Sequence, residues 1–491
     1  SSVPQPASSK AAKNAAEEVR NVQEGMARIV AAYQPRNPGN KACFSTQNPG
    51  SAAWRSQRLA CQSFKPTTSH NTMQPMHNKH RIATLLALTA ALAGCGGGTD
   101  KNSTPAPAPT PAPAPTPAPA PVPSAPIGVN FVLPSNNVLE ASASDGLVVN
   151  VSVNGSPAPN GTSVTLEVNP AAAATVAPVA PSTVGGVASA TLSVGSSVAA
   201  STPFQVKASA VSLSNTAMDT VTYYVRPTPK ALQVLVPAYF SSTGTSSPWN
   251  TLTAGATSYP DVQITAIANP HNGVITASTK VDADALKAIT AFKAVTGTTN
   301  KVVGYVATAS GSSGELSVTD VKATIDNYLT LYPGVLDGFF LDGMSTDSNR
   351  LAYFQDIYSY VQGKGSYKVI GNPGTYPAAA YASANSGTGV ADVLVTYAGN
   401  AAAYQAIDPQ PAHTWVYAKD NAAQAMLLHT ASTCTDMQTA LAKANSPRMN
   451  TGMVYATNLT IGTPWSALPT YWPQLLGTVD AINKKRTLPS C

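Results

Sequence analysis

The chain has 491 residues and a formal net charge of +6, but this charge is distributed unevenly. Residues 1–94 contain 11 lysines and arginines against 3 acidic residues, whereas residues 95–491 contain 18 basic and 20 acidic residues. Because nucleic-acid binding needs a clustered basic face, the nearly neutral larger part excludes a nucleic-acid partner.

The segment 76–94 has the pattern of a bacterial export signal. A methionine and two basic residues precede an apolar run at 82–91, which is followed by Leu-Ala-Gly-Cys. Such a run is too short for a membrane-spanning helix and is typical of a secretory signal. The last four residues resemble a lipobox, which implies that Cys95 carries a lipid. We therefore expect residues 1–75 to lie upstream of the true start, with an authentic N-terminal extension as the alternative.

The resemblance to lipoproteins also implies a location. Gly96, where an aspartate would signal retention, resembles lipoproteins sorted to the outer membrane, so we expect a lipid-anchored protein of a Gram-negative cell envelope. Residues 95–126 form a linker rich in Pro, Ala and Thr. This composition cannot bury a core and favours an extended polyproline II spacer. An unstructured tail without a spacing role fits the composition equally well.

Residues 127–227 have the pattern of an all-β domain. Short runs alternate apolar residues with Ser, Thr and Asn, and Gly and Asn mark the turns between them. The runs are Val129–Leu133, Leu147–Val153, Ser163–Val168, Ala190–Val194, Phe204–Ala208 and Thr220–Val225. Six short strands in about 100 residues predict an Ig-like sandwich. We interpret it as a spacer, with an adhesion module as the alternative.

Residues 228–487 alternate short apolar runs with helical patterns, which predicts a parallel sheet covered by helices. Eight runs in this length predict an α/β fold, a (β/α)₈ barrel, whose functional residues follow the carboxyl ends of the strands. The runs are Leu232–Val236, Val262–Ala268, Val302–Val306, Leu336–Leu341, Lys368–Gly371, Val393–Tyr397, Thr414–Tyr417 and Met453–Tyr455.

Motifs at the strand ends and helix starts of this region resemble spherulation-specific family 4, the spherulin-4-like proteins. They are Val236-Pro237-Ala238-Tyr239, Pro248-Trp249, Asn269-Pro270-His271-Asn272-Gly273, Gly304-Tyr305-Val306, Tyr332-Pro333-Gly334 with Asp337-Gly338-Phe339-Phe340-Leu341-Asp342, Gly371-Asn372-Pro373-Gly374-Thr375, and Leu468-Pro469-Thr470-Tyr471-Trp472. The resemblance implies a barrel related to glycoside hydrolases of galactosamine-containing polysaccharides.

Asp342 ends the fourth run and is the best candidate for a catalytic carboxylate. The alternative is a purely structural role, in which it caps the following loop. The resemblance places further acidic residues at three positions, where this chain has Gly343, Ala398 and Asn458. Glycoside hydrolysis needs two carboxylates, one of them a proton donor to the leaving oxygen. The sequence offers Asp347 as a weak second candidate, and its place before a helical pattern favours N-capping instead.

Residues at other strand ends are candidates for sugar binding. Aromatic rings stack on sugars and amides bond their hydroxyls, but the same residues also shape turns and pack loops. The candidates are Tyr239, Asn269, His271, Asn272, Tyr305, Asn372, Tyr397, Tyr417 and Tyr455.

Cys434 and Cys491 are an even pair in a chain predicted to be exported, so a disulfide between them is one hypothesis and two free thiols the other. No metal-binding spacing or Ser-His-Asp pattern is present, and we expect no metal, no cofactor and a monomer.

Three functions remain open. In order of preference, they are a surface-anchored hydrolase of an amino-sugar polysaccharide, a carbohydrate-binding barrel that has lost its acidic residues, and an adhesion or structural lipoprotein.

Overall fold

The computed structural model describes residues 126–132, 136–213, 215–273, 275–308, 316–382 and 389–491. The predicted signal, Cys95 and almost all of the predicted linker lie outside these residues. Within the described ranges, no helix is long and apolar enough to cross a membrane.

The N-terminal region is a sandwich of two sheets around its own apolar core. One sheet has the order β1-β3-β7-β6, with β4 paired to β3, and the other has the order β2-β9-β8-β5. Strict alternation along the strands builds this core; in β8, for example, Phe204, Val206, Ala208 and Ala210 are buried while the residues between them face outward. The strands are β1 (Ile127–Phe131), β2 (Val138–Glu140), β3 (Ser144–Val153), β4 (Ser156–Pro157), β5 (Val164–Asn169), β6 (Ala174–Ala177), β7 (Val187–Val194), β8 (Pro203–Ser212) and β9 (Asn215–Arg226).

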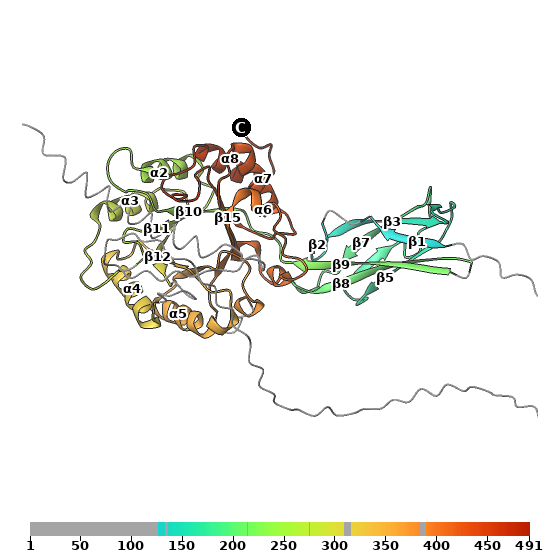
Figure 1. Ribbon diagram of the computed structural model, residues 1–491. Coiled ribbons are helices and arrows are strands. Elements are labelled where there is room, and N and C mark those ends of the chain that lie inside the picture. The colour runs from blue at the N-terminus through green and yellow to red at the C-terminus, as the bar shows by residue number, and fades with distance from the viewer. Residues whose placement is uncertain (1–125, 133–135, 214, 274, 309–315, 383–388) are drawn as a thin grey trace, which may run out of the picture. The chain divides into compact units, whose positions relative to one another are not determined.

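The C-terminal region is a closed barrel of parallel strands in chain order, surrounded by helices (Figure 1). This confirms the predicted fold class. The strands are β10 (Gln233–Ala238), β11 (Ile264–Ala268), β12 (Lys301–Ala307), β13 (Gly338–Asp342), β14 (Lys368–Asn372), β15 (Val393–Asn400), β16 (Gln424–His429) and β17 (Met453–Ala456). The helices are α2 (Pro248–Ser258), α3 (Ala283–Lys293), α4 (Val318–Leu331), α5 (Leu351–Lys364), α6 (Ala401–Tyr404), α7 (Cys434–Asn445) and α8 (Trp472–Asn483).

One predicted strand of the barrel is wrong. Residues Thr414–Ala418 form a 3-10 helix, η3, and the seventh strand is β16, which pairs with β15 and β17. The β-branched and aromatic residues of Thr414–Tyr417 suit a strand by composition, but Val416 and Tyr417 are buried outside the sheet. The Val416 carbonyl accepts a hydrogen bond from Gln424, the first residue of β16, so η3 lies at the amino end of that strand.

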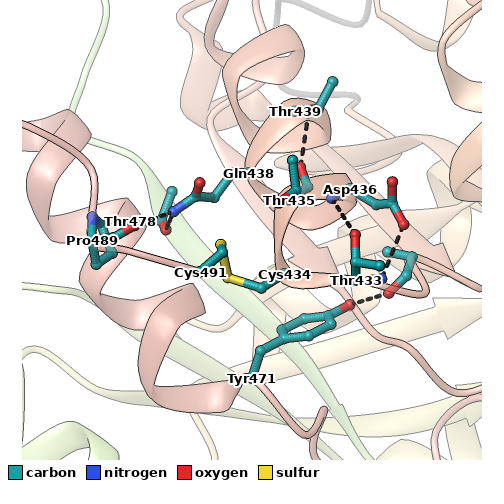
Figure 2. Close-up of a disulfide and its surroundings, with 11 residues drawn as sticks. Thr433, Cys434, Thr435, Asp436, Gln438, Thr439, Tyr471, Thr478, Pro489 and Cys491 are labelled. Carbon is teal, nitrogen blue, oxygen red and sulfur yellow. Dashed lines mark hydrogen bonds between the residues drawn. A yellow bond between two sulfur atoms is a disulfide. The ribbon is translucent and has the colours of Figure 1, made fainter.

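A disulfide joins the C-terminal residue Cys491 to Cys434 at the start of α7, with 5.5 Å between their Cα atoms (Figure 2). The same segment is held by a hydrogen bond of 2.8 Å from Gln438 to the Pro489 carbonyl. Thr433 caps α7 in a reciprocal arrangement with Asp436. The last residues of the chain are therefore fixed to the barrel at several points.

Candidate functional site

Asp342 lies at the carboxyl end of β13, between side chains from the two neighbouring strands. The Tyr305 hydroxyl of β12 donates to Oδ2 at 2.6 Å, and the Asn372 amide of β14 donates to Oδ1 at 2.7 Å. Parallel pairing places these residues together, because Asp342 is in register with Asn372 and lies beside the end of β12. The carboxylate is thus held by two neutral donors at the end of the barrel where such folds carry their chemistry.

No ion pair joins Asp342 to a basic side chain in the part of the chain that the structure describes. Its negative charge acts on the tyrosines instead. Burial, and then the charge of Asp342, raise the pKa of Tyr305 and the pKa of Tyr239 well above the usual value. Both hydroxyls therefore keep their protons, and the Tyr305 hydroxyl acts as the hydrogen-bond donor.

A cavity of about 210 Å³ opens beside this cluster, lined by the loops that follow β10 and β11 and by the start of α3. Its polar lining includes Tyr239, Ser241, Thr243, Asn269 and Asp282. Asp342 does not line the cavity itself. It is connected to the cavity through two rings, since the Tyr239 ring packs edge-on against Tyr305 with 5.3 Å between centroids.

The second predicted carboxylate, Asp347, and the carboxylate that lines the cavity, Asp282, each cap a helix. Asp347 is exposed, and its side chain accepts from the Asn349 backbone at 2.9 Å, capping the 3-10 helix η1 (Ser348–Arg350). Asp282, which the sequence did not single out, caps α3 by accepting from Ala285 at 2.9 Å. The arrangement around Asp347 is N-capping, the alternative that its position favours, and among the described residues no carboxyl group is hydrogen-bonded to Asp342.

The three positions where the resemblance places acids have local structural roles. Gly343 has a φ of 73°, in the left-handed region that favours glycine. The Ala398 amide donates to the Gly374 carbonyl at 3.0 Å. Asn458 accepts from the Thr470 amide at 2.9 Å and so shapes the loop between β17 and α8.

The asparagines and the histidine after β11 divide between the cavity and the loops. Asn269 lines the cavity, and its buried side-chain oxygen has no hydrogen-bond partner among the described residues. His271 forms a hydrogen bond of 2.8 Å with the Tyr332 hydroxyl, and burial lowers its pKa. The neutral ring therefore fixes the loop that follows β11. Asn272 has a φ of 53° and shapes the turn.

The predicted tyrosines also divide. Tyr239 and Tyr305 belong to the site, whereas Tyr397 is half-buried and donates to the Asn400 carbonyl at 3.1 Å. Tyr417 and Tyr455 are fully buried. Tyr417 lies in η3, away from the carboxyl ends of the strands, and donates to the Arg448 carbonyl.

The predictions of ligand contact therefore fail for Tyr417, because the seventh strand was misplaced, and for Tyr455, because no part of its side chain is accessible.

Sequence reasoning missed the loop residues of the cavity. Ser241, Thr243 and Asp282 follow no periodic pattern, so only the folded loops bring them together. In the described part of the chain, no group of three or more His, Cys, Asp or Glu residues could hold a metal ion.

The family model of spherulation-specific family 4 matches residues 233–479, about half of the chain. The chain belongs to this family. Spherulin-4 of Physarum polycephalum is 34% identical over 156 residues, a stretch that covers 32% of this chain and 43% of that protein. The match thus spans less than half the length of this curated family 4 relative.

Several solved structures are similar to the chain, among them the following two. One is Aspergillus clavatus Sph3 in complex with GalNAc, with a TM-score of 0.41 and 20% identity over 51% of this chain and 98% of that one. The other is a family 39 glycoside hydrolase from Bacteroides cellulosilyticus, with a TM-score of 0.35 and 10% identity over 72% and 82%. The family 4 match itself lies within the barrel.

Proposed function

We propose that the mouth of the barrel binds a polysaccharide that contains amino sugars of the galactosamine type, and that it does so without cleaving the chain. The observation that carries the proposal is the environment of Asp342, a carboxylate fixed by Tyr305 and Asn372 beside a polar cavity. A fixed carboxylate with aromatic and hydroxyl neighbours suits sugar hydroxyl and amino groups.

We favour binding over hydrolysis because the candidate partner carboxylates for Asp342 already have structural roles. Cleavage of a glycosidic bond requires two carboxyl groups, about 5 to 10 Å apart and on opposite sides of the bond. Asp347 and Asp282 each hold a helix start, and the positions of Gly343, Ala398 and Asn458 are neutral.

Slow hydrolysis is the second candidate, and one observation favours it. Asp282 lines the same cavity as Tyr239, and only one of its oxygens accepts the capping hydrogen bond. An enzyme built on Asp342 and Asp282 would release reducing ends from the polysaccharide.

The lipid anchor and the outer-membrane location are part of the proposal. They rest on the lipobox-like residues before Cys95, and the Ig-like sandwich and the linker would hold the monomeric barrel away from the membrane. Mass spectrometry of the membrane fraction should find diacylglycerol on Cys95, and C95A should release the protein; recovery of the unmodified wild type in the soluble fraction would refute the anchor.

The central experiment is calorimetric titration of the protein with GalNAc and with a partially deacetylated galactosamine polysaccharide. We expect saturable binding and no release of reducing ends over several days. D342N should weaken binding about tenfold, because the carboxylate fixes the Tyr305 hydroxyl and the Tyr305 ring packs against Tyr239, which lines the cavity.

D337N is the matched control, because Asp337 lies just before the other end of the same strand. It should leave binding unchanged. Turnover by the wild type that is lost in D342N would establish the hydrolase instead, and no saturable binding to either ligand would overturn both candidates.

A further inference from the structure

A second, smaller cavity adjoins the first one at Tyr239. It measures about 60 Å³ and is lined by Tyr239, Thr463, Pro464, Trp465 and Ser466. Because Tyr239 lines both cavities, a ligand that fills the larger cavity has the smaller one beside it. The mouth of the barrel thus offers two neighbouring positions.

The segment that carries Trp465 is a tight turn in the loop between β17 and α8. The Thr463 carbonyl accepts from the Ser466 amide at 3.3 Å and from the Ser466 hydroxyl at 3.0 Å. Pro464 occupies the second position of the turn, where its fixed φ restricts the backbone. The turn therefore holds Trp465 in place before any ligand arrives.

The ring of Trp465 is supported from the barrel. It packs against Tyr455 with 5.9 Å between centroids, and Tyr455 is a fully buried residue of β17. Trp465 itself is only partly buried and lines the cavity. An indole that is fixed on one side and open on the other gives a large apolar surface whose ordering on binding costs little entropy.

We infer that Trp465 and its turn form a second sugar position, in which the indole stacks on the unit next to the one held in the larger cavity. The inference rests on the proposed function and extends it from single sugars to a chain that passes over Tyr239. A cavity of this volume suits one face of a sugar ring, and its largely apolar lining suits the C–H face, while Thr463 and Ser466 add hydroxyl groups.

The test compares a monosaccharide with an oligomer. In calorimetric titrations with GalNAc and with its short oligomers, the wild type should bind the oligomers more tightly. W465A should weaken oligomer binding about tenfold, equal to roughly 1.4 kcal/mol, and should change GalNAc binding little. W465F keeps an aromatic ring on Tyr455 and should recover most of the oligomer affinity.

Controls separate the possible outcomes. I461A alters an exposed residue of the same loop that lines neither cavity, and it should behave as the wild type. If thermal melting shows that W465A is unfolded, W465F provides the test instead. Its affinity for oligomers should be close to that of the wild type. Equal binding of oligomer and monosaccharide by the wild type, or unchanged oligomer affinity in a folded W465A, overturns the second position and leaves the proposed function intact. Failure to bind either sugar overturns both.

Discussion

Two aspartates flank strand β13, and their surroundings differ. Asp337, just before the amino end, forms ion pairs with Lys293 at 2.8 Å and Lys301 at 3.4 Å and accepts from the Val302 amide at 2.8 Å. Asp342, at the carboxyl end, accepts hydrogen bonds from the neutral side chains of Tyr305 and Asn372, and it forms no ion pair among the residues that the structure describes. One carboxylate has its charge compensated within the protein, and the other keeps an uncompensated charge beside a cavity.

The difference matches the division of labour in barrels of this kind, whose amino end carries stability and whose carboxyl end carries function. At Asp337 the ion pairs with Lys293 of α3 and Lys301 of β12 connect both elements to the start of β13. At Asp342 the carboxylate is instead held by hydrogen bonds from Tyr305 and Asn372, next to the residues that line the cavity. We therefore expect changes at the two ends to separate stability from binding.

The largest effect on stability should come from the disulfide, which belongs to neither end of β13. The closed loop spans 57 residues, so replacing Cys434 and Cys491 together by serine should lower the free energy of unfolding by about 4 kcal/mol, within the usual range for native disulfides. Urea unfolding measures this change. Sugar binding should be unaffected under native conditions, and a clear loss of affinity in the folded double variant would contradict the separation.

D337N should have an intermediate effect, lowering the free energy of unfolding by about 1 to 2 kcal/mol. Most of the loss comes from Lys293 and the Val302 amide, because Lys301 is about half exposed and water screens its charge. D342N, measured in parallel by urea unfolding, should be less destabilised than D337N. A reversal of that order would break the comparison.

The smallest effect should come from the protonation of His271. It should change the free energy of unfolding by less than about 1 kcal/mol, and only as the solution becomes acidic. Burial lowers its pKa in the folded protein, so the unfolded chain binds more protons below the unfolded pKa of about 6.5. Stability should fall as the pH drops through that value and level off below the folded pKa. The negative charge of Asp282 opposes the shift.

H271Q removes this titration and can still bond to Tyr332, so its stability should depend less on pH between about 7 and 5 than that of the wild type. Thermal unfolding across this range measures the difference. Identical pH profiles of H271Q and the wild type would show that His271 does not contribute to the pH dependence of stability.

Sequence patterns located seven of the barrel strands because buried parallel strands are short, continuous apolar runs. They failed at Thr414–Tyr417, where strand-like composition occurs in a buried 3-10 helix, and at β16, which begins with a buried glutamine. Local composition does not show which of these two segments is the strand, because only tertiary packing distinguishes a short buried helix from a buried strand.

The site was predictable where a residue ends a strand, as Asp342 and Asn372 do. It was not predictable where loops meet. Ser241, Asp282 and Trp465 line the cavities from three separate loops, and nothing in their spacing indicates that the fold brings them near Tyr239. The capping role of Asp347 was the favoured alternative, since N-capping depends on local sequence alone.

The left-handed backbone at Gly343 restricts how this barrel could change in the future. A side chain in that conformation costs roughly 1 to 2 kcal/mol, so a single substitution to glutamate would be opposed by the backbone before any chemistry was gained. An acidic side chain directly after Asp342 would therefore require the loop that follows β13 to take another backbone path.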